Sequence, residues 1–162
     1  MLLIILFCTV TGARKSAEYN TRTKLLEQLV CMVDLIETEI RYSGATLCEI
    51  FTKISGRVEL NGLSFITECL AGMEEGEAFP AAFRKSVENW RCPLKSDDRQ
   101  LIFSFGGQLG KSDGEGQQSN CKLHSSLFKK AAEAARAERD KNGKLPFKLG
   151  VCAGLGIALM FI

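Results

Sequence analysis

Residues 25–44 read LLEQLVCMVDLIETEIRYSG, and this stretch decides the fold class. Its apolar residues recur at alternating steps of three and four, which is the spacing of one face of an α-helix. The glycine at the end stops the pattern, because glycine is common just beyond the end of a helix. The residues of this face are Leu26, Leu29, Val33, Ile36 and Ile40, with Leu25, Val30 and Leu35 at its edges. We therefore predict a long amphipathic helix over residues 16–43.

Shorter patterns of the same kind fill the rest of the middle of the chain. Each has apolar residues at helical spacing and a glycine or a proline near one end, which marks a boundary. No stretch of useful length alternates between apolar and polar residues as a strand would. The predicted helices are one from Leu47 that stops before Gly56, one from Leu63 that ends near Gly72, one from Phe79 to Trp90 with Pro80 in its first turn, and one that is capped by Ser96 and ended by Gly110.

The longest of the later patterns begins at Ser112-Asp113-Gly114-Glu115, which fits a capping box. In that arrangement the serine side chain and the glutamate three residues later satisfy each other's free backbone N–H groups. We predict a helix from there to about Lys141, ended by Asn142-Gly143. Its inner face consists of Gln117, Cys121, His124, Phe128, Ala131, Ala135 and Glu138. Because short connections make neighbouring helices antiparallel, the predicted fold class is all-α, an antiparallel bundle of about six helices.

Both ends of the chain lack charged residues. All 21 Lys and Arg and all 19 Asp and Glu lie between Arg14 and Lys148. Uncharged apolar runs are typical of membrane segments, although each run is shorter than the ~20 residues that usually span a bilayer. We predict an N-terminal membrane segment over residues 1–13, a cytoplasmic helical bundle over residues 14–144 and a C-terminal transmembrane segment over residues 145–162.

The charges beside these two segments indicate their orientation. Arg14 and Lys15 follow the first segment, and Lys141, Lys144 and Lys148 precede or open the second. Positive residues favour the cytoplasmic side, so the bundle between the two flanks is predicted to lie in the cytoplasm. The second segment also has a stripe of small residues, which permits close helix packing within lipid. The residues of this stripe are Gly150, Gly154 and Gly156.

Two other interpretations of the ends stay open. Thr11-Gly12-Ala13 resembles a signal-peptide cleavage site. The alternative function is therefore an exported or tail-anchored helical binding module, cut after Ala13, with an unrelated partner. In the other interpretation both ends are core helices of a soluble protein, although such helices usually have a polar face and these do not.

Composition excludes several classes of protein. The net charge of +2 disfavours a strongly cationic nucleic-acid-binding protein. Ten Phe and regular apolar spacing disfavour intrinsic disorder. The seven cysteines lie at least seventeen residues apart, without the paired spacing of a zinc site or the pattern of a disulfide framework. We expect them to be reduced and structural.

A search for catalytic groups finds only weak candidates. His124, the only histidine, lies three residues after Cys121 on one helix face, which would suit half of a metal site or a Cys–His pair. No second pair exists, and a polar spot in a helix interface is the simpler interpretation. Gly106, Gly107 and Gly110 lack the order of a phosphate-binding loop. The sequence therefore predicts no catalytic residue, no metal, no cofactor and no small-molecule substrate.

Charge is distributed unevenly within the middle of the chain. Residues 58–83 contain no Lys or Arg, so their glutamates could dock a basic partner, or form an ordinary solvated surface. Residues 122–148 are basic, which suits contact with lipid headgroups. The acidic candidates for partner binding are Glu68, Glu74, Glu75 and Glu77, with Glu59 before them.

Several motifs resemble a known family over nearly the whole chain. Leu109-Gly110-Lys111-Ser112-Asp113 is followed by Gln117, by a long helix rich in Ala and Lys, and by Lys148-Leu149-Gly150 at the start of the apolar tail. With the long helix over residues 16–43, which has Glu37, Glu39, Ile40 and Arg41 near its end, these motifs resemble the stage III sporulation protein AB family. The resemblance makes Lys111, Ser112, Asp113 and Gln117 candidates for partner contact.

The resemblance implies a function that composition does not indicate. That family forms part of the channel between mother cell and forespore, and its helical domain is similar to that of type II secretion protein F. By this analogy the chain would be a non-enzymatic platform on the mother-cell side of the outer forespore membrane. It would hold a cytoplasmic secretion-type ATPase, stage III sporulation protein AA, and couple it to the other membrane proteins of the stage III A operon.

Overall fold

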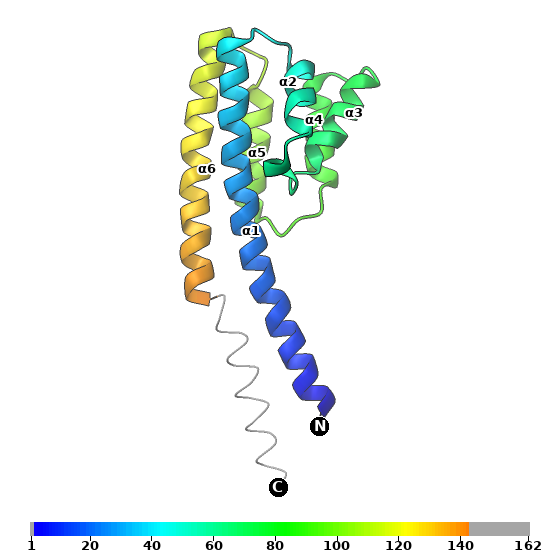
Figure 1. The fold of residues 1–162 in the computed structure, drawn as a ribbon, viewed down its shortest axis with the longest axis vertical. Helices are drawn as coiled ribbons and strands as arrows, with labels where there is room; N and C mark the ends of the chain where they lie inside the picture. The colour runs from blue at the N-terminus through cyan, green and yellow to red at the C-terminus, as the bar shows by residue number, and fades with distance from the viewer. Residues whose placement is uncertain (1, 143–162) are drawn as a thin grey trace. The chain divides into compact units, whose positions relative to one another are not determined.

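The computed structural model describes residues 2–142, and the surroundings of the side chains of residues 14–141. Residues 2–142 form six α-helices and one short 3₁₀ turn, η1, with no strand among them (Figure 1). The elements are α1 Leu2–Tyr42, α2 Leu47–Ser55, η1 Val58–Leu60, α3 Phe65–Glu74, α4 Phe79–Asn89, α5 Ser96–Gln108 and α6 Gly114–Asn142. The predicted all-α helical bundle is confirmed for this part of the chain.

The described residues belong to two compact units. The larger unit comprises residues 24–132 and holds almost all of the buried apolar side chains. The smaller unit is formed by residues 2–23 of α1 and residues 133–142 of α6. Within the smaller unit, Arg22 Nη1 lies 2.9 Å from Glu138 Oε2, so an ion pair joins its two helices.

The apolar face predicted for α1 forms one wall of the core of the larger unit. Ile40, at the end of that face, is half-buried. Burial of a Leu or Ile side chain contributes roughly 1.5–3 kcal/mol, so this face supplies much of the stability of the bundle. The fully buried residues of α1 are Leu26, Leu29, Met32, Val33 and Ile36.

Phe83 of α4 belongs to an aromatic cluster inside the larger unit. Phe51 of α2 and Phe65 of α3 meet its ring edge to face, with centroid distances of 6.3 and 5.6 Å. The ring of Trp90 lies 5.0 Å from that of Phe65. Phe83 also packs against Gly106 of α5, where a Cβ would overlap the ring. The cluster therefore holds four helices together, and the glycine allows the closest of these contacts.

The last helix contributes the inner face that its sequence predicts. Cys121, His124 and Phe128 of α6 are buried within the larger unit. Beside them, Ser125 donates a hydrogen bond to Asp34 of α1. Helices at opposite ends of the described chain are therefore neighbours in the bundle, as Figure 1 also shows for α1 and α6.

The cap predicted for α6 is wrong by one residue. Asp113, rather than Ser112, accepts a hydrogen bond from the backbone N–H of Gly116, at 2.9 Å. Serine and aspartate are both good cap residues, and the backbone geometry here places the aspartate in this position. A Cβ on Gly116 would lie 2.7 Å from Ser112 Oγ, so the serine packs closely over the first turn instead of capping it.

The start of α5 differs from the prediction in the same way. Ser96 is its first helical residue, and Lys95 holds the cap position. The backbone N–H of Lys95 donates to Asp98 Oδ2 at 3.0 Å. The acceptor, Asp98, lies in the first turn of α5, where a carboxylate also suits the positive end of the helix dipole.

Two other boundaries differ from the predictions. α1 begins at Leu2 rather than near residue 16, so the predicted domain boundary after Ala13 falls inside it. α3 begins at Phe65, because the backbone N–H of Leu63 donates to Leu60 in a turn that follows η1. α3 also continues past Gly72 to Glu74.

Within residues 2–142, no helix combines the length and the apolar character needed to cross a membrane. The predicted C-terminal transmembrane segment, residues 145–162, lies outside the described residues. The same holds for its small-residue stripe, Gly150, Gly154 and Gly156.

Candidate functional site

The two candidates for catalysis, Cys121 and His124, do not bond each other. His124 Nδ1 lies 3.0 Å from the backbone oxygen of Asn120, and Nε2 lies 3.3 Å from Ser104 Oγ on α5. The imidazole ring also stacks at a tilt against Phe105, with centroids 5.4 Å apart. Both ring nitrogens are therefore occupied by partners within the helix interface.

The environment of Cys121 disfavours a role as a nucleophile. Its thiol is fully buried, and burial raises its pKa to about 12. Glu37 and Asp34, nearby on α1, contribute to this raised pKa, because a thiolate would be repelled by their charge. A nucleophilic cysteine requires the opposite shift. Among the described residues, no group of three or more His, Cys, Asp or Glu is arranged to hold a metal ion.

The candidate residues of the α5–α6 loop lie together on the surface. Lys111, Ser112 and Asp113 are exposed, and Gln117 is half-buried. The Gln117 Nε2 atom donates to the backbone oxygen of Ser112 at 3.0 Å. Because Asp113 caps α6, two of the four side chains hold the loop in place. Gly110, the second residue of the loop, has a positive φ of 82° and fixes the direction of the loop.

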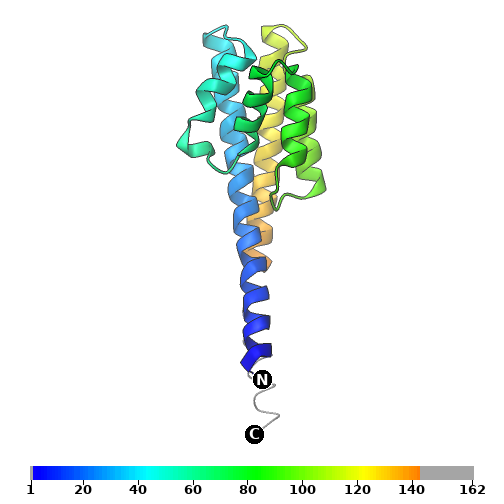
Figure 2. The same ribbon diagram turned by 90° about the vertical axis from the view of Figure 1, so that its right-hand side faces the viewer.

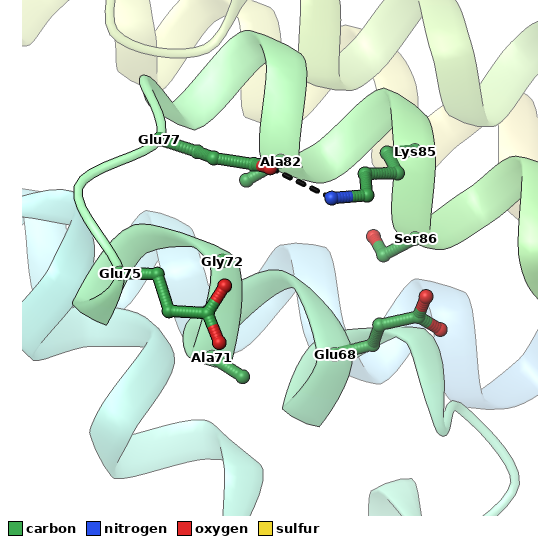
Figure 3. A pocket seen from close by; sticks show the side chains of 8 residues that line it. All are labelled: Glu68, Ala71, Gly72, Glu75, Glu77, Ala82, Lys85 and Ser86. Carbon is green, nitrogen blue, oxygen red and sulfur yellow. Dashed lines mark hydrogen bonds and ion pairs between the residues drawn. The ribbon is translucent and has the colours of Figure 1, made fainter.

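Three of the four acidic candidates line one pocket between α3 and α4. Glu68, Glu75 and Glu77 surround a space of about 150 Å³, whereas Glu74 does not line it. Figure 3 shows these three carboxylates around the pocket, with Lys85 reaching in from α4. The remaining lining residues are Ala71, Gly72, Ala82 and Ser86.

Two of the three carboxylates of this pocket have partners within the chain, and one of these partners is a cation. Lys85 Nζ lies 2.7 Å from Glu77 Oε1, and this contact raises the pKa of the lysine. Asn89 Nδ2 donates to Glu68 Oε1 at 2.6 Å. Glu75 has no such partner among the described residues. The surface is therefore less acidic than the composition of residues 58–83 suggests, because Lys85 of α4, which follows that stretch, lies beside its carboxylates.

One surface feature was missed by sequence reasoning. Tyr42, the last residue of α1, is 77% exposed. The guanidinium of Arg41 lies 5.6 Å from the centre of its ring, within the range of a cation–π contact. The exposure of this tyrosine could have been predicted from its position directly before the Ser43-Gly44 turn, because a helix end at a turn is exposed.

The predicted acidic and loop candidates therefore occupy two different parts of the larger unit. The pocket lies between α3 and α4, and the loop joins α5 to α6. Neither arrangement brings together a base, a nucleophile and a group that orients them, which acyl or phosphoryl transfer would require. Exposed charges over a buried helical core are instead suited to contact with another macromolecule.

Comparison with known proteins identifies a family over the whole chain. The family model described as stage III sporulation protein AB matches residues 1–162. A relative from Bacillus subtilis (strain 168), named stage III sporulation protein AB, is 24% identical over 164 residues, which cover 99% of this chain and 96% of the relative. No solved structure matches the chain. Because the family model covers its whole length, the chain belongs to the stage III sporulation protein AB family.

Proposed function

We propose that the chain is a non-enzymatic membrane platform of the channel between mother cell and forespore. In this role it anchors a cytoplasmic secretion-type ATPase, stage III sporulation protein AA, and couples it to the membrane subunits of the channel. Membership of the stage III sporulation protein AB family supports the sporulation role. The coupling role rests on the likeness of family members to type II secretion protein F.

One structural observation carries the proposal: α1 is a single helix from Leu2 to Tyr42. Its first residues, 2–13, belong to the uncharged run, and its later residues supply the buried face of the bundle. No loop interrupts the chain between the two. A platform needs such a connection, because a loop would absorb the movement that the platform is to transmit.

The proposed membrane attachment rests on the distribution of charge. The N-terminal segment over residues 1–13 and the C-terminal segment over residues 145–162 enter the membrane, and glycines of the second segment pack against neighbouring helices. The basic flanks Arg14 and Lys15 hold the bundle on the cytoplasmic side. We place the protein in the outer forespore membrane, with its bundle facing the mother cell and its basic flanks against lipid headgroups.

Two surfaces are proposed to contact protein partners. The first is the α5–α6 loop with Lys111, Ser112, Asp113 and Gln117, where Lys111 is exposed and free of ion pairs among the described residues. The second is the α3–α4 pocket with Glu68, Glu75 and Glu77, with Glu74 nearby in the sequence. Neither surface requires a cofactor or a nucleic acid.

The experiment is a pull-down of tagged full-length protein from detergent-solubilised membranes of sporulating cells, with partners identified by mass spectrometry. The expected result is recovery of the ATPase together with small membrane proteins of the channel. Alkaline carbonate extraction of the same membranes should leave the protein in the pellet. Release by carbonate, or recovery from the membrane without any channel protein, would contradict the platform function.

Sequencing of the mature N-terminus distinguishes the platform from an exported module. A chain that still carries residues 1–13 is expected for the platform. A mature chain that begins at Arg14 would instead favour an exported helical domain held by its C-terminal tail.

A further inference from the structure

Two loops that are far apart in the sequence lie at the same end of the larger unit. The α1–α2 loop covers residues 43–46 and the α5–α6 loop covers residues 109–113. A Cβ on Gly110 would lie 2.9 Å from Leu47 Cδ1, so the second loop touches the start of α2. Figures 1 and 2 both show the end of α1 and the beginning of α6 at one end of this unit.

The hydrogen bond between Asp34 and Ser125 gives the same placement. From Asp34 to Tyr42, α1 continues for about 12 Å, at a rise of roughly 1.5 Å per residue. From Ser125 back to Gly114, α6 extends for about 16 Å by the same rise. Measured along the helices from the Asp34–Ser125 hydrogen bond, Tyr42 and the loop that contains Lys111 therefore lie at similar distances toward the same end of the larger unit.

The carboxylates in and beside these loops are mostly used within the chain. Glu49 Oε2 accepts from the backbone N–H of Thr46 at 2.8 Å, and this bond lowers the pKa of Glu49. Asp113 caps α6. Glu39 Oε2 accepts from Lys53 Nζ at 2.6 Å, and this bond lowers the pKa of Glu39. These anions are thus held by local donors.

Two cations at this end have no ion-pair partner. Arg41 and Lys111 are exposed, and neither forms an ion pair with any described residue. Tyr42 stands beside Arg41 with 77% of its surface exposed. Two carboxylates that form no ion pair with a described residue are nearby in the sequence. Glu115 is exposed in the first turn of α6, where the helix dipole favours it, and Glu37 is half-buried one turn before Arg41.

We propose that Arg41, Tyr42 and Lys111 form a docking surface, the α1/α6 end surface, for an acidic segment of a partner protein. Exposed Tyr and Arg side chains are the types that contribute most to binding energy at protein interfaces. Two cations without partners attract a carboxylate-rich segment and speed its association. The proposal rests on the platform function: it places on the secretion-type ATPase an acidic segment that meets this surface.

The first test measures binding of the purified ATPase to full-length protein in detergent. The double variant Arg41→Glu, Lys111→Glu and the single variant Tyr42→Ala should each weaken binding about tenfold, which corresponds to one lost contact of an interface hot spot. Affinity of the unchanged protein should fall as salt is raised, because exposed charges are screened.

Matched variants control for charge and for loss of an exposed apolar side chain. Lys122→Glu with Lys130→Glu makes the same change of charge on exposed positions of α6. Val58→Ala trims a residue that is 75% exposed, close to the exposure of Tyr42. Both controls should bind within about twofold of the unchanged protein. If the end-surface variants bind like these controls while the ATPase still binds, the end surface is wrong and the platform function stands.

A second test uses benzoylphenylalanine at position 42 in sporulating cells. Irradiation should link position 42 to a peptide of net negative charge, which mass spectrometry would locate on the secretion-type ATPase. If the purified ATPase fails to bind, the platform function loses its partner, and this crosslink then decides the end surface by itself. A crosslink to a neutral or basic peptide, or none, overturns the proposal.

Discussion

Ser125 of α6 donates a hydrogen bond of 2.6 Å to Asp34 Oδ1 of α1, across 91 positions of the sequence. The serine side is buried, whereas the aspartate is exposed and also lies 3.8 Å from Lys129 Nζ. A bond to a charged acceptor is the stronger kind, because the carboxylate attracts the donor proton more than a neutral oxygen would. This bond fixes the register of the first helix against the last within the larger unit.

The variant Ser125→Ala should lower the free energy of unfolding by about 1–2 kcal/mol, because the bond to a charged group is lost at a partly buried place. Urea denaturation followed by circular dichroism would measure the change. Ser126→Ala is the matched control, since Ser126 is exposed and its hydroxyl bonds only the backbone of Leu123 in its own helix. Equal effects of the two substitutions would contradict this role of Ser125.

The sequence was sufficient to predict the helices but not the way some of them begin. The apolar faces of α1 and α6 are visible as periodic residues, and both are buried as predicted. The caps were misplaced because Ser112 and Asp113 are both good cap residues, and only the backbone geometry selects the aspartate. Local spacing cannot make that choice.

The candidate site was predictable only in part, for a similar reason. Glu68, Glu75 and Glu77 were found from composition, but their pocket depends on the pairing of α3 with α4. Lys85 was not predicted to line the pocket. Its contact with Glu77, eight residues earlier in the sequence, depends on how α4 packs beside the loop that precedes it. Tyr42 was not predicted as a site residue, because apolar periodicity detects buried residues and this side chain is exposed on the surface.

Two adjacent glycines of α5 should respond in opposite ways to alanine. A Cβ at Gly106 would overlap the Phe83 ring, so Gly106→Ala should destabilise the protein by about 1–3 kcal/mol through overpacking. At Gly107 nothing lies within 4 Å of a Cβ, so Gly107→Ala should stabilise α5 by about 1 kcal/mol through helix propensity. Thermal denaturation of both variants provides the comparison. No loss of stability for Gly106→Ala would show that Phe83 does not pack on α5 in this way, and a loss for Gly107→Ala would show that the space beside Gly107 is not open.

Asn120 is a buried side chain whose polar atoms are unsatisfied. It is 8% exposed, and neither Oδ1 nor Nδ2 has a hydrogen-bond partner. An unsatisfied buried polar group costs about 1–3 kcal/mol, so Asn120→Leu, which keeps a similar size, should raise the melting temperature. Asn89→Leu is the control, because Asn89 is exposed and its single bond to Glu68 contributes little there. A fall in melting temperature for Asn120→Leu alone would mean that the amide is bonded in solution.

Cys69 and Cys121 should resist alkylation in the folded protein. Both are fully buried, and burial raises the pKa of each thiol to about 12. Since the pKa is raised, the neutral thiol prevails up to that pH, and at pH 8 only about one thiol in ten thousand is the reactive thiolate. Iodoacetamide at pH 8, followed by peptide mass spectrometry, should leave both unmodified in native protein and modify both in urea. Fast labelling of Cys121 in the native state would show that α6 opens from the bundle, because neither acidity nor access would otherwise permit the reaction.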